Sequence, residues 1–115
     1  MGESIAGQFL ERKGYRLIEK NFRKPWGEID IIAQDGNVVV FVEVKANARD
    51  FGGEFNPEIR VDQKKMNKIT KTAALYIAYE LKRMDCEWRV DIISVTIENG
   101  KAKITHFKNV AEAFQ

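Results

Sequence analysis

Two apolar segments joined by a short polar turn dominate the hydrophobic pattern of this 115-residue chain. The first runs from Gly27 to Ala33 and the second from Val38 to Lys45, and β-branched residues fill much of both. Between them, Asp35 to Asn37 supply the Asp-Gly type of turn that joins antiparallel strands. The pattern therefore predicts a β-hairpin.

The second segment is apolar on both of its faces. Its side chains alternate, with Val39, Phe41, Glu43 and Lys45 on one face and Val38, Val40, Val42 and Val44 on the other. A strand covered on both faces belongs to the middle of a sheet, where an ionised carboxylate costs several kcal/mol unless an opposite charge compensates it. We therefore expect Glu43 to have a charged partner.

The first segment brings further acids to the same hairpin. Strict alternation places Glu28, Asp30 and Ile32 on one face and Ile29 and Ile31 on the other. A divalent cation would offset the repulsion between acids from two neighbouring strands, because hard cations bind carboxylate oxygens. The alternative is an ordinary ion pair between Glu43 and Lys45, with Asp30 solvated.

The hairpin resembles a known nuclease signature. Asp30 followed by Glu43-Val44-Lys45 resembles the Asp…(Asp/Glu)-x-Lys motif of the PD-(D/E)XK nuclease superfamily. The same residues, with Gly27-Glu28-Ile29 before Asp30, are similar to the YraN-like family of small bacterial proteins, which are similar to archaeal Holliday junction resolvases. The resemblance covers nearly the whole chain, so it implies a single nuclease-like domain over residues 1–115.

The resemblance implies a metal-dependent endonuclease that acts on structured or branched DNA. Asp30, Glu43 and the Val44 carbonyl would hold Mg²⁺ or Mn²⁺, and Glu3 on the first helix would complete the acidic cluster as an outer or second-metal ligand. Lys45 would orient the attacking water and stabilise the charge that develops on the phosphate. For Glu3 the alternative is a helix-dipole acid that points at solvent.

Two other functional classes stay open. The chain could bind nucleic acid without cutting it, or it could be a protein-interaction module that retains the nuclease fold. Metal binding separates cleavage from binding alone, and salt-dependent DNA affinity separates nucleic-acid binding from protein binding.

Helical and strand periodicity predicts the elements around the hairpin. In chain order they are a helix from Gly2 to Lys13, a strand from Tyr15 to Phe22, a long helix from Asp62 to about Met84, strands from Trp88 to Ile97 and from Lys101 to Phe107, and a short helix within Asn109 to Phe114. This order matches the αβββαβ core of the restriction-endonuclease-like fold. We therefore expect an α/β fold with a mixed central sheet flanked by helices.

Basic residues near the acids are candidates for phosphate contacts. They are Arg23, Lys24, Arg49, Lys64, Lys65 and Lys68. The last three lie in the first turns of the long helix, where the alternative is a solvated helix face. Arg49 lies in the irregular segment from Ala46 to Val61, which could instead be a lid or dock on a second subunit, so a homodimer stays open. Trp26 could stack on a base, although partly buried packing is the commoner role of such a residue.

Composition adds limits rather than a function. A net charge of +2 does not by itself indicate a nucleic-acid binder. The single Cys86 excludes an internal disulfide and suits a reducing compartment, so we expect the cytoplasm. The longest apolar run, Val38 to Val42, is too short to cross a bilayer. His106 has no second His in the chain, so we expect a surface or capping role, and Arg89 with Asp91 predicts an ion pair at a sheet edge.

Overall fold

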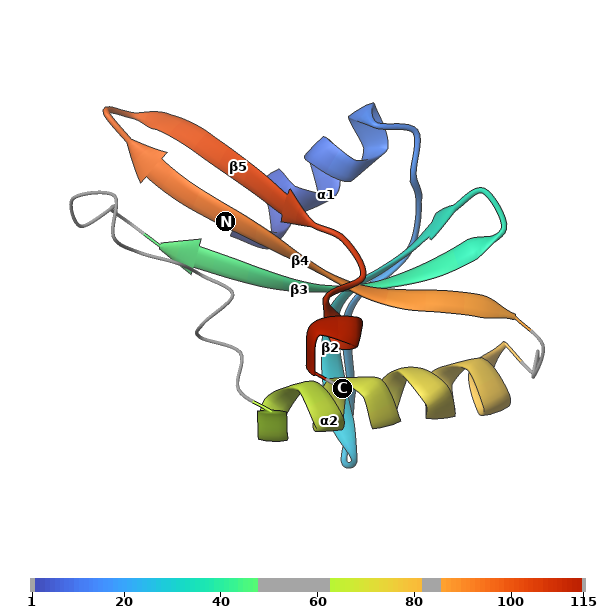
Figure 1. Cartoon of the computed structure of the whole chain (residues 1–115). Coiled ribbons are helices and arrows are strands. Elements are labelled where there is room, and N and C mark those ends of the chain that lie inside the picture. Colours follow the sequence, from blue (N-terminus) through green and yellow to red (C-terminus); the bar gives the residue numbers. More distant parts are fainter. Residues whose placement is uncertain (1, 48–62, 82–85, 115) are drawn as a thin grey trace.

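A five-stranded mixed sheet with helices on both faces forms the protein (Figure 1). The computed structural model describes residues 2–47, 63–81 and 86–114. Its elements are α1 (Gly2–Arg12), β1 (Arg16–Lys24), β2 (Gly27–Asp35), β3 (Val38–Asn47), α2 (Gln63–Leu75), a π-helical segment (Tyr76–Glu80), β4 (Glu87–Glu98), β5 (Lys101–Phe107) and a short 3₁₀ helix (Val110–Phe114). The mixed α/β fold and the order of the predicted elements are confirmed, and the order is compatible with an αβββαβ core. The long helix, however, ends at Glu80 in the π-helical segment, and its predicted end residues Asp62 and Met84 lie outside the described residues.

The strands follow the order β1-β2-β3-β4-β5, so β3 is central, as its two apolar faces predicted. Only the β3–β4 pair is parallel, and the other three pairs are antiparallel. A parallel pair needs a long crossover, which α2 provides. No helix in the described part of the chain is long and apolar enough to cross a membrane.

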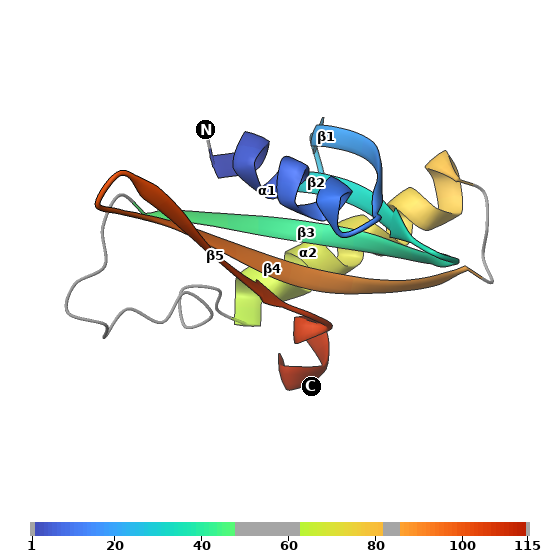
Figure 2. The same ribbon diagram turned by 90° about the horizontal axis from the view of Figure 1, so that it is seen from above.

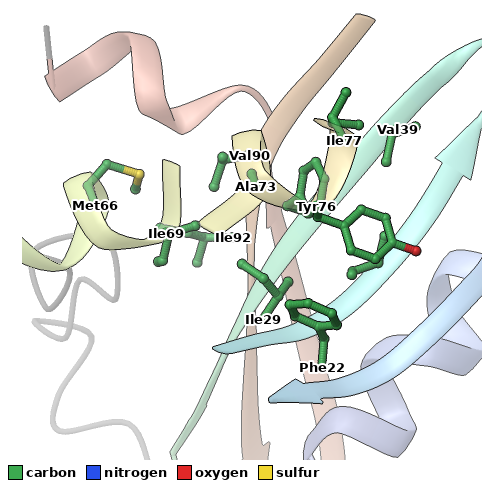
Figure 3. Packing of buried hydrophobic residues seen from close by; sticks show 12 residues of the cluster. Phe22, Ile29, Val39, Met66, Ile69, Ala73, Tyr76, Ile77, Val90 and Ile92 are labelled. Carbon is green, nitrogen blue, oxygen red and sulfur yellow. The ribbon is translucent and has the colours of Figure 1, made fainter. Parts of the chain in front are cut away.

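The helices divide the core into two layers (Figure 2). On one face, α1 packs Ala6 and Leu10 against Val40 and Val42 of β3. On the other face, α2 and the 3₁₀ helix cover a larger cluster, whose buried members include Phe41, Met66, Ile69, Tyr76 and Ile92 (Figure 3). The alternation predicted for β3 is therefore confirmed, because consecutive residues of β3 enter opposite layers.

Both tight hairpins are made by residues that tolerate a positive φ. Gly36 has a φ of 61° between β2 and β3, as expected at the first central position of a type II′ turn. Asn99 and Gly100 have φ values of 50° and 75° between β4 and β5, the pattern of a type I′ turn. These turns fix the strand registers on which the site depends.

Strict alternation fails in β2, and the prediction that Ile29 and Ile31 share a face is wrong. Ile29 lies in the α2-side layer together with Ile32, whereas Ile31 lies in the α1-side layer. In β1 the residue between the partners of Ile29 and Ile31 is Asn21, which has a φ of 52°. The alternation of β2 is therefore interrupted at Asp30, and the tip of the β1–β2 hairpin extends past the sheet alongside α2 (Figure 1).

A buried polar cluster centred on Asp91 stabilises β4 and β5, and neither Asp30 nor Glu43 belongs to it. Asp91 is fully buried and accepts hydrogen bonds from Arg89 Nε at 3.0 Å and from the Asn109 amide at 2.9 Å, and His106 Nε2 lies 2.7 Å from it. Burial alone would raise the pKa of Asp91, but these hydrogen bonds together hold it below its ordinary value. The Arg89–Asp91 ion pair is confirmed, although β4 is not an edge strand. A surface or capping role was expected for His106, and the surface role is wrong, because its side chain is 5% exposed.

The start of β2 touches α2 at a glycine. Gly27 is buried, and a Cβ atom added to it would lie 1.9 Å from Oγ1 of Thr72. Thr72 is itself buried and donates its hydroxyl hydrogen to the Lys68 carbonyl at 2.8 Å. Only glycine lets a strand backbone approach a helix so closely. This contact sets the distance between the hairpin tip and α2.

We expect Gly27→Ala to lower the free energy of unfolding by about 1–3 kcal/mol, the usual cost of forcing extra volume into a packed site. Thr72→Ala should restore part of that loss in the double variant, since it removes the nearest clashing atom. Urea denaturation of the wild type, both single variants and the double variant measures the coupling. Strictly additive losses would show that the Gly27–Thr72 contact does not set the spacing.

Candidate functional site

The acids Asp30 and Glu43 come together where β3 continues beyond its partner β2. The β2–β3 ladder ends at the pair Ile31–Val42, while β3 stays paired with β4 as far as Asn47. Val44 N donates instead to Asp30 Oδ2 at 2.8 Å. Because the N–H and C=O of one strand residue point toward the same neighbouring strand, the Val44 carbonyl is also directed to the Asp30 side.

Glu43 lies on the α2 side of the sheet and is paired with two lysines. Its side chain is only 11% exposed, and its Oε1 lies 2.9 Å from Lys65 Nζ and 3.9 Å from Lys45 Nζ. Lys45 follows Glu43 on the same face of β3, as alternation predicted, whereas Lys65 arrives from the first turn of α2. The expected charged partner of Glu43 is therefore present twice.

The two lysines do not fully offset the effects that raise the pKa of Glu43. Burial raises the pKa of Glu43, the Asp30 carboxylate raises it further, and the two lysines only partly oppose this. Burial and the charge of Lys65 lower the pKa of Lys45. Burial would also lower the pKa of Lys65, but its hydrogen bond and attraction to Glu43 leave that pKa raised. The site thus holds an acid that resists ionisation beside an amine that gives up its proton more readily than usual.

Glu43 forms part of the wall of an open pocket of about 590 Å³ between α2 and the β1–β2 hairpin. We call it the lysine pocket, because its charged lining consists of Lys24, Lys64, Lys65 and Lys68 with Glu28 and Glu43. Four of the six basic residues predicted to contact nucleic acid therefore surround one cavity. Their convergence was not visible in the sequence, because Lys24 lies at the end of β1 and the other three lie on α2.

Glu3 lies apart from this pocket. It lines a second pocket of about 450 Å³ with Lys20, Asn21 and Val44, on the side of the sheet that α1 covers. Its Oε1 atom is buried and has no hydrogen-bond partner among the described residues. Within the described ranges, no group of three or more His, Cys, Asp or Glu side chains is placed to hold a metal ion. The structure thus brings Asp30 and Glu43 together and places Glu3 on the other side of β3.

The remaining predicted residues contribute less to the site. Arg23 does not line the lysine pocket and forms an ion pair with Glu28. Arg49 and the rest of its segment from residue 48 onward lie outside the described residues. Ala46 and Asn47, which were expected to be irregular, still belong to β3 and pair with β4. The direct bond between Lys65 and Glu43 was missed, because periodicity gives the face of a helix residue and not its partner on a distant strand. The only sequence signal was the lysine cluster at the start of α2.

Known proteins resemble the chain over nearly all of its length. It is 40% identical to a UPF0102 protein of Fervidobacterium nodosum, over 99% of this chain and 81% of that protein. It is 44% identical to a UPF0102 protein of Thermodesulfovibrio yellowstonii, over 94% of this chain and 89% of that protein. Among solved structures, SfsA of Pyrococcus furiosus in complex with Ca²⁺ is similar with a TM-score of 0.41 and 17% identity, over 90% of this chain and 58% of that chain.

Similarity to a solved structure at that level says nothing about activity. The sequence similarity to the two UPF0102 proteins is much stronger evidence. A family profile matches residues 2–95, and the two relatives match this chain almost from end to end. This agrees with the resemblance to the YraN-like family. The chain therefore belongs to the uncharacterised protein family UPF0102.

Proposed function

We propose that this protein is a metal-dependent endonuclease that hydrolyses phosphodiester bonds in structured or branched DNA. One observation carries the proposal: Glu43, in the wall of a pocket that four lysines line, lies 3.9 Å from Lys45 Nζ and close enough to Asp30 for that carboxylate to raise its pKa. Paired carboxylates and an amine suit chemistry on a phosphate, and the surrounding lysines suit its charge.

The donor set fits a hard divalent cation. Mg²⁺ is commonly bound by one or two protein carboxylates and keeps several waters, so Asp30, Glu43 and the Val44 carbonyl would suffice. Lys65 Nζ, 2.9 Å from Glu43, shows that a positive charge is stable at this position. Glu3 suits at most an outer position, because it lines the pocket on the α1 side. When bound, Mg²⁺ or Mn²⁺ would polarise the phosphate and ease deprotonation of water.

The chain's own residues would orient the reactants. Lys45 is held beside Glu43, and its lowered pKa makes it suitable for holding and orienting a water molecule. In its charged form it would stabilise negative charge that develops on the phosphate. Lys64 and Lys68, both exposed on α2, would contact the flanking phosphates.

A second function has its own support. Four lysines line the pocket, while only two acids meet at β3 among the described residues. That balance also suits a module that binds nucleic acid without cutting it. The two functions predict the same binding of DNA and differ in metal binding and cleavage.

We expect Asp30→Asn, Glu43→Gln and Lys45→Ala each to lower the cleavage rate by at least about a hundredfold. Their DNA affinities should stay within a few-fold of wild type, because binding is spread over many phosphate contacts. Labelled linear, flap and four-way junction DNA with Mg²⁺ or Mn²⁺ measures both, and Glu19→Gln, an exposed acid on β1, is the control. Lys45→Ala cleaving at the wild-type rate would remove Lys45 from the mechanism. Wild-type binding without cleavage would favour the binding module.

Glu43→Gln should make the metal-free protein more stable at neutral pH. Because the folded-state pKa of Glu43 is raised, its stabilising contribution is complete below the ordinary value of 4.5 and is lost as the pH rises through the folded-state pKa. The variant's advantage should therefore shrink in acid. Denaturation in EDTA across this range, with Glu19→Gln as the control, measures it. A variant less stable than wild type at neutral pH would mean that the lysines compensate Glu43 fully.

A further inference from the structure

An aromatic side chain stands exposed beside the lysine pocket. Trp26 is 48% exposed in the two-residue turn between β1 and β2, and Tyr79 is the only other large hydrophobic residue exposed in the described part of the chain. Isolated exposed aromatics are common and need no explanation. Trp26 differs from Tyr79 in its position, because its chain neighbours Pro25 and Gly27 both line the lysine pocket.

The turn that carries Trp26 is fixed to the helix across the pocket. Lys24 Nζ lies 3.8 Å from Glu80 Oε1 in the π-helical segment, and Gly27 lies against Thr72 of α2. Beneath the turn, the ring of Phe22 meets that of Tyr76 edge to face with centroids 5.2 Å apart. An aromatic side chain on a turn anchored in this way can contact a ligand at a low entropic cost.

The charges near Trp26 suit an anion. Glu28 and Glu43, the acids of the pocket, are paired with Arg23 and with Lys65 respectively. Lys64 and Lys68 form no ion pair with any described residue and are exposed. The surface therefore offers positive charge within the pocket and an exposed aromatic side chain on the turn that borders it.

We propose that Trp26 stacks on an unpaired nucleobase whose neighbouring phosphates lie in the lysine pocket. A nucleotide combines a flat π-face with a phosphate, and an unpaired base exposes that face, whereas a base inside a duplex is already stacked on its neighbours. An anionic membrane surface also attracts Trp and Lys, but its flat surface does not match lysines that line a concave pocket. This inference rests on the proposed action on DNA and adds the type of DNA structure that the site selects.

The test compares three DNA probes: a duplex with a central bulge, the same bulge with abasic nucleotides, and the fully paired duplex. Fluorescence anisotropy in EDTA measures affinity where no metal-dependent cleavage occurs. Wild type should prefer the bulge over the abasic bulge by between about fivefold and a hundredfold, the range of one base–aromatic stack. Trp26→Ala should lose this preference, Trp26→Phe should keep most of it, and Tyr79→Ala should keep all of it.

Tryptophan emission gives an independent signal. Binding of the bulged probe should quench emission in wild type and leave it unchanged in Trp26→Phe, whose remaining Trp88 packs edge to face with Phe41 at a centroid distance of 5.7 Å. An unchanged preference in Trp26→Ala, or no binding of any probe by wild type, would overturn the inference. So would Trp26-dependent binding to phosphatidylserine vesicles without DNA binding. Bulge binding without cleavage in Mg²⁺ or Mn²⁺ would instead refute the nuclease proposal and leave the role of Trp26 intact.

Discussion

The separation of β2 from β3 at Asp30 is the constraint on which the rest of the site depends. A regular antiparallel pair would have continued past Ile31–Val42 and filled the space beside the end of β3. Instead, the Asp30 carboxylate accepts a hydrogen bond from the Val44 amide, so this backbone donor is satisfied without a backbone partner on a neighbouring strand. The β1–β2 hairpin is then free to lean toward α2, and the lysine pocket opens between them.

The same separation explains the unusual charges of the site. Glu43 stays on a central strand with its side chain nearly buried, and Asp30 is close enough to oppose its ionisation. Lys65 from α2 is the closest compensating charge, and Lys45 is farther away. Ion pairs of this kind are seldom the most stable solution for a protein core, because desolvation offsets much of the attraction. Retaining two acids here is easier to explain by chemistry than by stability.

Much of the fold could be predicted from local patterns, and the exceptions have physical causes. The two apolar faces of β3 predicted its central place, and the Asp-Gly sequence predicted the turn between β2 and β3. Ile29 was misplaced because a left-handed residue in the neighbouring strand, Asn21, cannot be recognised from period-two alternation. The close approach of Gly27 to Thr72 depends on tertiary packing, which no local pattern encodes.

The candidate site was predictable to the extent that its residues are close in sequence. Glu43 and Lys45 share a strand, and Asp30 lies across one turn, so their proximity follows from the hairpin. The contact of Lys65 with Glu43 depends on where the crossover after β3 places α2. The position of Glu3 depends instead on the face of the sheet that α1 covers. The family resemblance supplied Glu3 as a candidate, and the structure places it in the pocket on the α1 side of the sheet.

Thermal melting with and without metal tests the central claim, that Asp30 and Glu43 form a cation site, most directly. The wild type and Asp30→Asn would be melted in EDTA, in Mg²⁺ and in Mn²⁺. Our account predicts that metal raises the melting temperature of the wild type much more than that of Asp30→Asn, since binding to the folded state adds about 2.7 kcal/mol at a hundredfold excess over Kd. Equal shifts in both proteins, or no shift in either at millimolar metal, would contradict it.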